Sequence, residues 1–168
     1  MPSTYTLIAS NTVGAGGVSS ITFSSIPATY TDLVLLMSLR QDGAGSNVRY
    51  AINGATTGYS ESLLYGSGSV VGATTASTSY FNLVYTNGSG ETANLFGNLQ
   101  TYIPNYAGSQ LKPIGVESVY ENNSTGATQA LTAQLWSNTS AITSITITPA
   151  TTNWVQYSTV YLYGIKNS

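Results

Sequence analysis

The chain has 168 residues, of which 42% are hydrophobic, and this length is typical of one globular domain with its own hydrophobic core. Only 6% of the residues are charged, where roughly 25% is usual, and the formal net charge is -2. Four cationic side chains cannot neutralise a run of phosphates, so we expect no binding to nucleic acid. The chain has neither cysteine nor histidine, which excludes disulfides and thiolate metal sites and removes the most common general base.

Nothing in the sequence predicts a membrane or secretion signal. The longest apolar run, from Leu33 to Met37, is far shorter than the about 20 residues that a membrane-spanning helix needs. The opening residues, MPSTYTLIAS, lack the basic start of a signal peptide. Uncharged polar side chains must therefore cover most of the surface, and a surface with so little charge favours association.

The sequence alternates between short β-type segments and turn residues along its whole length. Asn53-Gly54 and Asn87-Gly88 predict tight hairpin turns, because these dipeptides tolerate positive φ angles. Only 59–65 (YSESLLY) resembles a helical turn, and it is too short to be stable alone. We expect strands near 4–9, 18–23, 33–40, 48–52, 79–86, 92–96, 98–103, 114–120, 129–136, 142–148 and 156–165.

The segment 33–40 is apolar on both faces of the expected strand, which predicts a central strand covered on both sides. One face carries Leu33, Leu35, Met37 and Leu39, and the other carries Val34 and Leu36.

The segment 156–165 alternates instead. Val160 and Leu162 are expected to face the core, which leaves Tyr157, Tyr161 and Tyr163 as a tyrosine row on the outer face. Such a row is either a buried wall or a contact between subunits. We also expect this last strand and the first strand, 4–9, to belong to the core sheets rather than to mobile tails.

About ten short strands separated by turn signals predict an all-β fold, an antiparallel β-sandwich of Greek-key or jelly-roll type. No change of composition, linker or internal repeat divides the sequence. Residues 1–168 are therefore expected to form a single domain.

The residues do not predict catalysis. A serine nucleophile needs a base, and neither Lys112 nor Lys166 lies in a Ser-x-x-Lys motif. Glu117 and Glu121 would lie about 13 Å apart on one strand face, which exceeds the separation that glycosidases use. We therefore expect no enzyme activity, no catalytic residue and no cofactor.

The loops carry only weak binding motifs. The glycines of 13–17 precede a strand, whereas a phosphate-binding loop precedes a helix, so a flexible hairpin loop is expected there. Residues 42–47 resemble half of a calcium loop, with Asp42, Ser46 and Asn47 as oxygen donors, but calcium needs six to eight oxygens and usually several carboxylates, so a plain turn is favoured over a metal site. The sequons at Asn87, Asn122, Asn123 and Asn138 are expected by chance in a chain rich in Asn, Ser and Thr.

Aromatic side chains are the remaining feature with functional content. Thirteen tyrosines and two tryptophans, Trp136 and Trp154, suit either protein interfaces or stacking against sugar rings. The sequence leaves both uses open.

Two segments, YTLIASNTVGAGGVSSITFSSIPATYTDLVLLMSLR (5–40) and STVYLYGIKNS (158–168), resemble small virion proteins of tailed bacteriophages, including phages of aquatic bacteria. The resemblance covers roughly a third of the chain and includes no catalytic motif. It implies a component of the virion, and we expect a capsid decoration (cement) protein at the capsid surface. Its partners would be the phage major capsid protein and itself, as a homotrimer, with no membrane partner.

The alternative is a tail-fibre or adhesin module that binds host surface glycan. In that case Trp136, Trp154 and loop tyrosines would line a shallow stacking site.

Overall fold

The computed structural model describes residues 4–44, 47–68, 70–82, 84–121 and 126–166. These residues form eleven β-strands and no helix, which confirms the all-β class. Within them, no helix is long and apolar enough to cross a membrane. The strands are β1 (Tyr5–Thr12), β2 (Ile21–Phe23), β3 (Asp32–Leu39), β4 (Val48–Ile52), β5 (Tyr59–Gly66), β6 (Val71–Thr78), β7 (Gly97–Ile103), β8 (Lys112–Glu121), β9 (Ala127–Trp136), β10 (Ile145–Pro149) and β11 (Thr159–Ile165).

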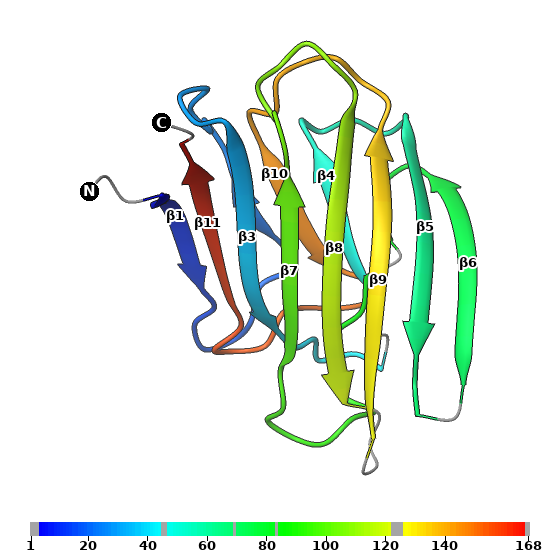
Figure 1. Cartoon of the computed structure of the whole chain (residues 1–168). Helices are drawn as coiled ribbons and strands as arrows, with labels where there is room; N and C mark the ends of the chain where they lie inside the picture. Colours follow the sequence, from blue (N-terminus) through cyan, green and yellow to red (C-terminus); the bar gives the residue numbers. More distant parts are fainter. Residues whose placement is uncertain (1–3, 45–46, 69, 83, 122–125, 167–168) are drawn as a thin grey trace.

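The strands form two layers, as expected for a β-sandwich. Eight strands make an antiparallel sheet in the order β1-β11-β3-β7-β8-β9-β5-β6, and three make a small sheet in the order β2-β10-β4. Figure 1 shows β10 and β4 behind the large sheet, beside β3, β7 and β8. The chain changes sheet at every connection from β1 to β5, as in Greek-key and jelly-roll folds. We call the face of the large sheet toward the small sheet the inner face, and the opposite one the outer face.

The main hydrophobic core fills the space between the two sheets. The small sheet contributes Ile145 and Ile147, and the Tyr50 hydroxyl lies 3.7 Å from the Met37 sulfur and 3.5 Å from the Thr101 hydroxyl. The inner face of β3 contributes four side chains that are at most 4% exposed: Leu33, Leu35, Met37 and Leu39.

On the other side of β3, the described part of the chain forms no second layer. Leu36 is 38% exposed on the outer face, so the expectation that this strand is covered on both sides is wrong. Val34 on the same face is buried, but its cross-strand partners are Tyr163 and Tyr102. Neighbouring aromatic rings, and not a second sheet, account for its burial.

The first and last strands lie within the large sheet, as expected. β11 pairs with β1 on one side and with β3 on the other, and Val160 and Leu162 are fully buried. β1 is an edge strand with a register shift between Leu7 and Ala9. The first and last strands, β1 and β11, therefore stabilise one another through their backbone pairing.

The segment 59–65, whose pattern resembles a helical turn, is strand β5. Tyr59, Glu61 and Leu63 are buried, and the residues between them are exposed, so the period is two. Backbone pairing to β9 on one side and β6 on the other fixes the extended form.

Three other assignments also differ from the sequence prediction. Strand β6 was not predicted, because VGATTAST has small side chains and little alternation. The described residues of 79–86, all but 83, make isolated bridges at Phe81 to Tyr50 and at Tyr85 to Asn47 instead of a strand. The segment 92–96 is a loop.

The predicted turns are only partly confirmed. Asn53 and Gly54 have positive φ angles of 52° and 66°, but they connect strands of different sheets and so do not form a hairpin. Neither Asn87 nor Gly88 is among the residues with positive φ. The glycine loop 13–17 also connects the two sheets, and a Cβ at Gly17 would lie 2.7 Å from the Trp154 carbonyl oxygen.

Deletion of 158–168 should abolish cooperative thermal unfolding, measured by circular dichroism, because it removes β11 from between β1 and β3.

Leu162→Ala should lower the free energy of unfolding by about 2–5 kcal/mol, since it leaves a cavity in the core.

Tyr161→Ala, on the exposed face of the same strand, is the matched control for Leu162→Ala. It should lower the free energy of unfolding by about 1 kcal/mol or less. A truncated chain that melts like the full-length chain would show that β11 is dispensable.

Candidate functional site

The outer face carries a row of exposed apolar side chains across most of the large sheet. Tyr161 and Leu36 are each 38% exposed, Leu131 is 50% exposed and Leu64 is 61% exposed. Only Glu117 in this row is charged, and its carboxylate accepts a hydrogen bond of 3.1 Å from the Gln129 amide. The strand registers give the members of this outer row, one from each strand, as Ser10, Tyr161, Leu36, Gln100, Glu117, Leu131, Leu64 and Ala73.

A second row runs beside the first and contains no charged residue. Leu7 is 51% exposed and Tyr102 is 39% exposed. The Tyr102 hydroxyl donates a hydrogen bond of 2.7 Å to the Asp32 carboxylate, and this bond raises the pKa of Tyr102. The members of this second row are Leu7, Tyr163, Val34, Tyr102, Gly115, Ala133, Ser62 and Thr75.

The structure separates the three tyrosines of the predicted contact row. Tyr161 and Tyr163 lie on the outer face of β11 with their rings stacked at a centroid distance of 6.4 Å. Tyr5 of β1 meets the edge of Tyr163 at 6.2 Å. Tyr157 precedes the strand in a turn, has a φ of 72° and is 69% exposed. Tyr161 and Tyr163 therefore belong to one aromatic cluster with Tyr5. Tyr157 lies outside this cluster, in the turn just before the start of β11.

A shallow apolar hollow of about 520 Å³ interrupts the two rows near the middle of the sheet. It forms where Gly115 has no side chain and where a Cβ would meet open space. Tyr102, Leu131 and Leu64 line it together with Pro113. A protruding apolar side chain of a partner could fill this hollow.

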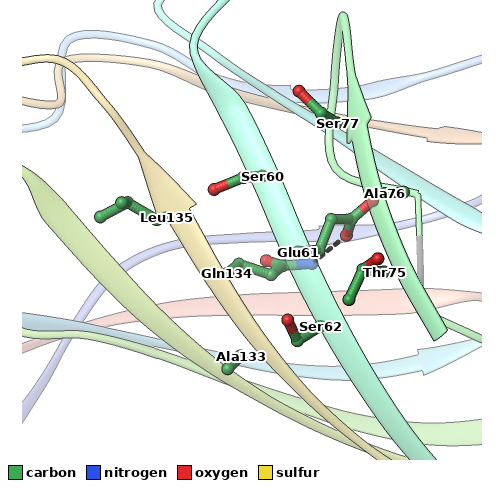
Figure 2. A pocket seen from close by; sticks show the side chains of 9 residues that line it. All are labelled: Ser60, Glu61, Ser62, Thr75, Ala76, Ser77, Ala133, Gln134 and Leu135. Carbon is green, nitrogen blue, oxygen red and sulfur yellow. Dashed lines mark hydrogen bonds between the residues drawn. The ribbon is translucent and has the colours of Figure 1, made fainter. Parts of the chain in front are cut away.

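A second shallow hollow, of about 480 Å³, lies over β9, β5 and β6. Figure 2 shows Ser60, Ser62 and Thr75 around it, with Glu61 beside Gln134. The buried Glu61 carboxylate accepts hydrogen bonds from the Gln134 amide at 3.0 Å and from the Asn82 backbone at 2.7 Å. This carboxylate thus ties β5 to β9 and to the segment that follows β6.

Three of the four cations make structural contacts. The Arg40 guanidinium donates to the backbone carbonyls of Thr92 at 2.8 Å and Leu95 at 2.9 Å. Lys112 is 1% exposed and donates to the carbonyls of Gly108 and Gln110, and its burial lowers its pKa. The Arg49 guanidinium carbon lies 4.9 Å from the centre of the Tyr80 ring.

The acidic side chains are also engaged. Glu91 accepts a hydrogen bond from the Gly88 backbone at 2.5 Å, and Glu121 accepts from the Thr92 backbone at 3.1 Å. Asp42, in the calcium-like loop, accepts from the Thr152 hydroxyl and from the Asn153 backbone, and these bonds lower its pKa. No group of three possible metal-ligating side chains occurs among the residues that the structure describes, and residues 45 and 46 of this loop lie outside them.

The sequons do not mark a common surface. Asn87 is 1% exposed, and its side-chain oxygen accepts a hydrogen bond from the Glu121 backbone at 3.4 Å, so it is inaccessible to modification. Asn138 accepts from the Ser140 backbone in a turn. Asn122 and Asn123 lie outside the described residues.

The stacking site expected around the tryptophans is wrong. Trp136 is 1% exposed and Trp154 is 0% exposed, and both belong to the main core. The Trp154 indole donates to the Ile147 carbonyl at 3.2 Å. A glycan could not reach either ring in this structure.

The sequence analysis missed Leu64 and Leu131 as surface residues. Leu64 follows Leu63 in the segment that resembles a helical turn, and Leu131 lies in the expected strand 129–136, for which no inner face was predicted. The signal that would have identified them is the period of two in β5, which places Leu64 opposite the buried Leu63.

Comparison of the chain with protein-family models, with curated proteins and with solved structures gives no match.

Arg40→Lys should lower the free energy of unfolding in urea by about 2 kcal/mol, because an ammonium group cannot reproduce the forked contacts to several carbonyls. Lys166→Arg, an exposed exchange in the opposite direction, is the control and should have no effect. An unchanged urea midpoint for Arg40→Lys would contradict the role of Arg40 in holding the 91–95 loop.

Proposed function

We propose that this chain is a non-catalytic structural protein of a tailed-phage particle, a capsid decoration protein that binds the assembled head through the outer face of its large sheet. The observation that supports this most directly is the outer row, in which tyrosine and leucine side chains are exposed across a nearly uncharged sheet. Exposed apolar patches of this kind mark protein interaction surfaces.

The chemistry of the outer face suits contact with a folded protein surface. Tyr161 and Leu36 at one end and Leu131 and Leu64 at the other supply apolar area, and hydroxyl and amide groups between them supply hydrogen bonds. Glu117 is the single charge to be desolvated in the outer row. A protein that binds the assembled lattice, and not its separate subunits, stabilises the lattice by mass action.

The edges of the large sheet support self-association as part of this function. β6 is an edge strand of eight residues with no charge, no proline and a regular pairing to β5. Proteins usually protect such edges with charges, prolines or bulges. The other edge, β1, has a register shift that distorts it. The homotrimer expected on a capsid lattice remains a prediction. In it, the exposed β6 edge would be one of the surfaces through which the subunits contact each other.

The contacts of the ionisable side chains support a role without catalysis. Arg40 and Lys112 bind backbone carbonyls, and Glu61, Glu91 and Asp42 accept hydrogen bonds from nearby backbone or hydroxyl groups. Each of these contacts fastens a loop or a strand. The buried positions of Trp136 and Trp154 remove both tryptophans from the stacking site of the adhesin alternative, which leaves only its tyrosines.

Leu131→Lys should lower the fraction of protein bound to heads by about tenfold or more, because it places a charge among the exposed leucines of the proposed contact and beside the apolar hollow that Leu131 lines. The measurement is co-sedimentation with DNA-filled, tail-less heads prepared from phage that lacks the gene. Thr22→Lys, on the exposed side of the small sheet, is the control and should bind normally.

Cryo-microscopy of the complete particle should show the protein on the head. Localisation at the tail alone would contradict the proposal, as would full binding by Leu131→Lys.

Self-association should depend little on salt, because the surfaces available for it carry few charges. Light scattering at micromolar concentration and at two salt levels should give the same oligomer, a trimer. Thr75→Lys should weaken it by placing a charge on the β6 edge. A monomer both in solution and on the particle would refute the association, and an oligomer that dissociates in moderate salt would refute its apolar cause.

A further inference from the structure

A tyrosine-lined hollow lies on the inner face, where β5 and β6 extend past the small sheet (Figure 1). Its volume is about 360 Å³, within the roughly 300–1,000 Å³ of small-molecule pockets. Seven uncharged residues line this tyrosine hollow: Leu63, Tyr65, Ala73, Thr74, Tyr85, Tyr120 and Thr128.

The three rings are held in place by packing. Tyr85 and Tyr120 lie with their ring centres 5.8 Å apart and their planes tilted by 31°. The Tyr65 ring lies against Gly72 of the neighbouring strand, where a Cβ would come within 2.6 Å of two ring carbons and the hydroxyl oxygen. Leu63 is 2% exposed and forms, with Ala130, a small apolar cluster separate from the main core. The hollow is thus preformed on a rigid sheet.

The polar groups around the hollow are neutral. Thr74 and Thr128 contribute hydroxyls beside the phenols. Burial raises the pKa of Tyr85 and of Tyr120, and the charges of Glu61 near Tyr85 and Glu91 near Tyr120 act in the same direction. The phenols are therefore uncharged at neutral pH, and the nearby carboxylates disfavour an anionic ligand.

We propose that the tyrosine hollow binds a neutral sugar, with one pyranose ring stacked against Tyr85 and Tyr120 and its hydroxyls bonded to Thr74 and Thr128. A pyranose combines an apolar C–H face with a rim of hydroxyl groups, and the hollow combines aromatic rings with neutral hydroxyls in the same way. This site goes beyond the proposed function. It lies on the inner side of the sheet, so the failure of sugar binding and the failure of head binding are separate results.

The test is a titration of the full chain, followed by the NMR signals of the tyrosine rings. Methyl glucoside, N-acetylglucosamine and galactose are the neutral sugars, and galacturonic acid is the anionic match for galactose. At least one neutral sugar should give saturable shifts, and galacturonic acid should bind more weakly than galactose. Lactose and cellobiose show whether the natural ligand is a glycan chain or a free sugar. Tighter binding of a disaccharide than of its single sugar rings indicates a glycan chain, and equal binding indicates a free sugar.

Two variants locate the site. Tyr85→Ala should lower the affinity by about tenfold through loss of a stacking ring. Thr74→Phe should abolish binding by filling the hollow from an exposed strand position, where a phenylalanine is compatible with the β-sheet. Tyr30→Phe is the matched control, because the Tyr30 ring packs against Gly164 of β11, next to the opposite edge of the large sheet from β5 and β6.

Circular dichroism and thermal melting should show that Thr74→Phe and Tyr30→Phe remain folded. Three results would overturn the proposal: no saturable shift with any neutral sugar, binding of galacturonic acid at least as tight as that of galactose, or unchanged affinity in both Tyr85→Ala and Thr74→Phe.

Discussion

The difference in size between the two sheets is the constraint on which the rest of the structure depends. Eight strands lie in one layer and three in the other, so the small sheet covers only part of the inner face. The segment 79–88 extends the cover, since Phe81 and Val84 are buried and Phe81 bridges to Tyr50 of β4. Beyond it, β5 and β6 are covered incompletely, and the tyrosine hollow forms there. The outer face is left with only its own side chains for cover.

The scarcity of charge follows a consistent pattern in the fold. Arg40 and Lys112 are buried against backbone carbonyls, and Glu61 is buried between an amide side chain and a backbone N–H. Buried ions need such hydrogen bonds, because desolvation without a partner is costly. As a result, several of the few charges hold loops and strands in place and do not contribute to the outer face. The two outer rows of the large sheet carry a single charge, Glu117, and this low charge is the property that the proposed attachment uses.

The two proposed surfaces lie on opposite faces of the same sheet, and this arrangement makes them compatible. The outer row, represented by Leu36 and Leu131, would be covered in a particle-bound subunit. The tyrosine hollow, around Tyr85 and Tyr120, opens on the inner side. A subunit attached through its outer face would therefore keep the hollow accessible. Because β8 and β9 contribute residues to both proposed surfaces through positions of opposite orientation, the period of two in the strands places these surfaces on different faces.

The sequence by itself determined the β-sheet class and the orientation of strands with a clear alternation. Val160 and Leu162 are buried and Tyr161 is exposed as predicted, because alternate residues of a strand must point to opposite faces. Only the tertiary structure decided the state of 59–65, since seven residues satisfy a helical or an extended pattern equally, and pairing with β9 and β6 selects the strand. The tertiary structure also placed both tryptophans in the core and aligned Tyr161, Leu36, Leu131 and Leu64 into one row. That row depends on the register of strands far apart in the sequence, and backbone hydrogen bonds set this register only after the strands have come together.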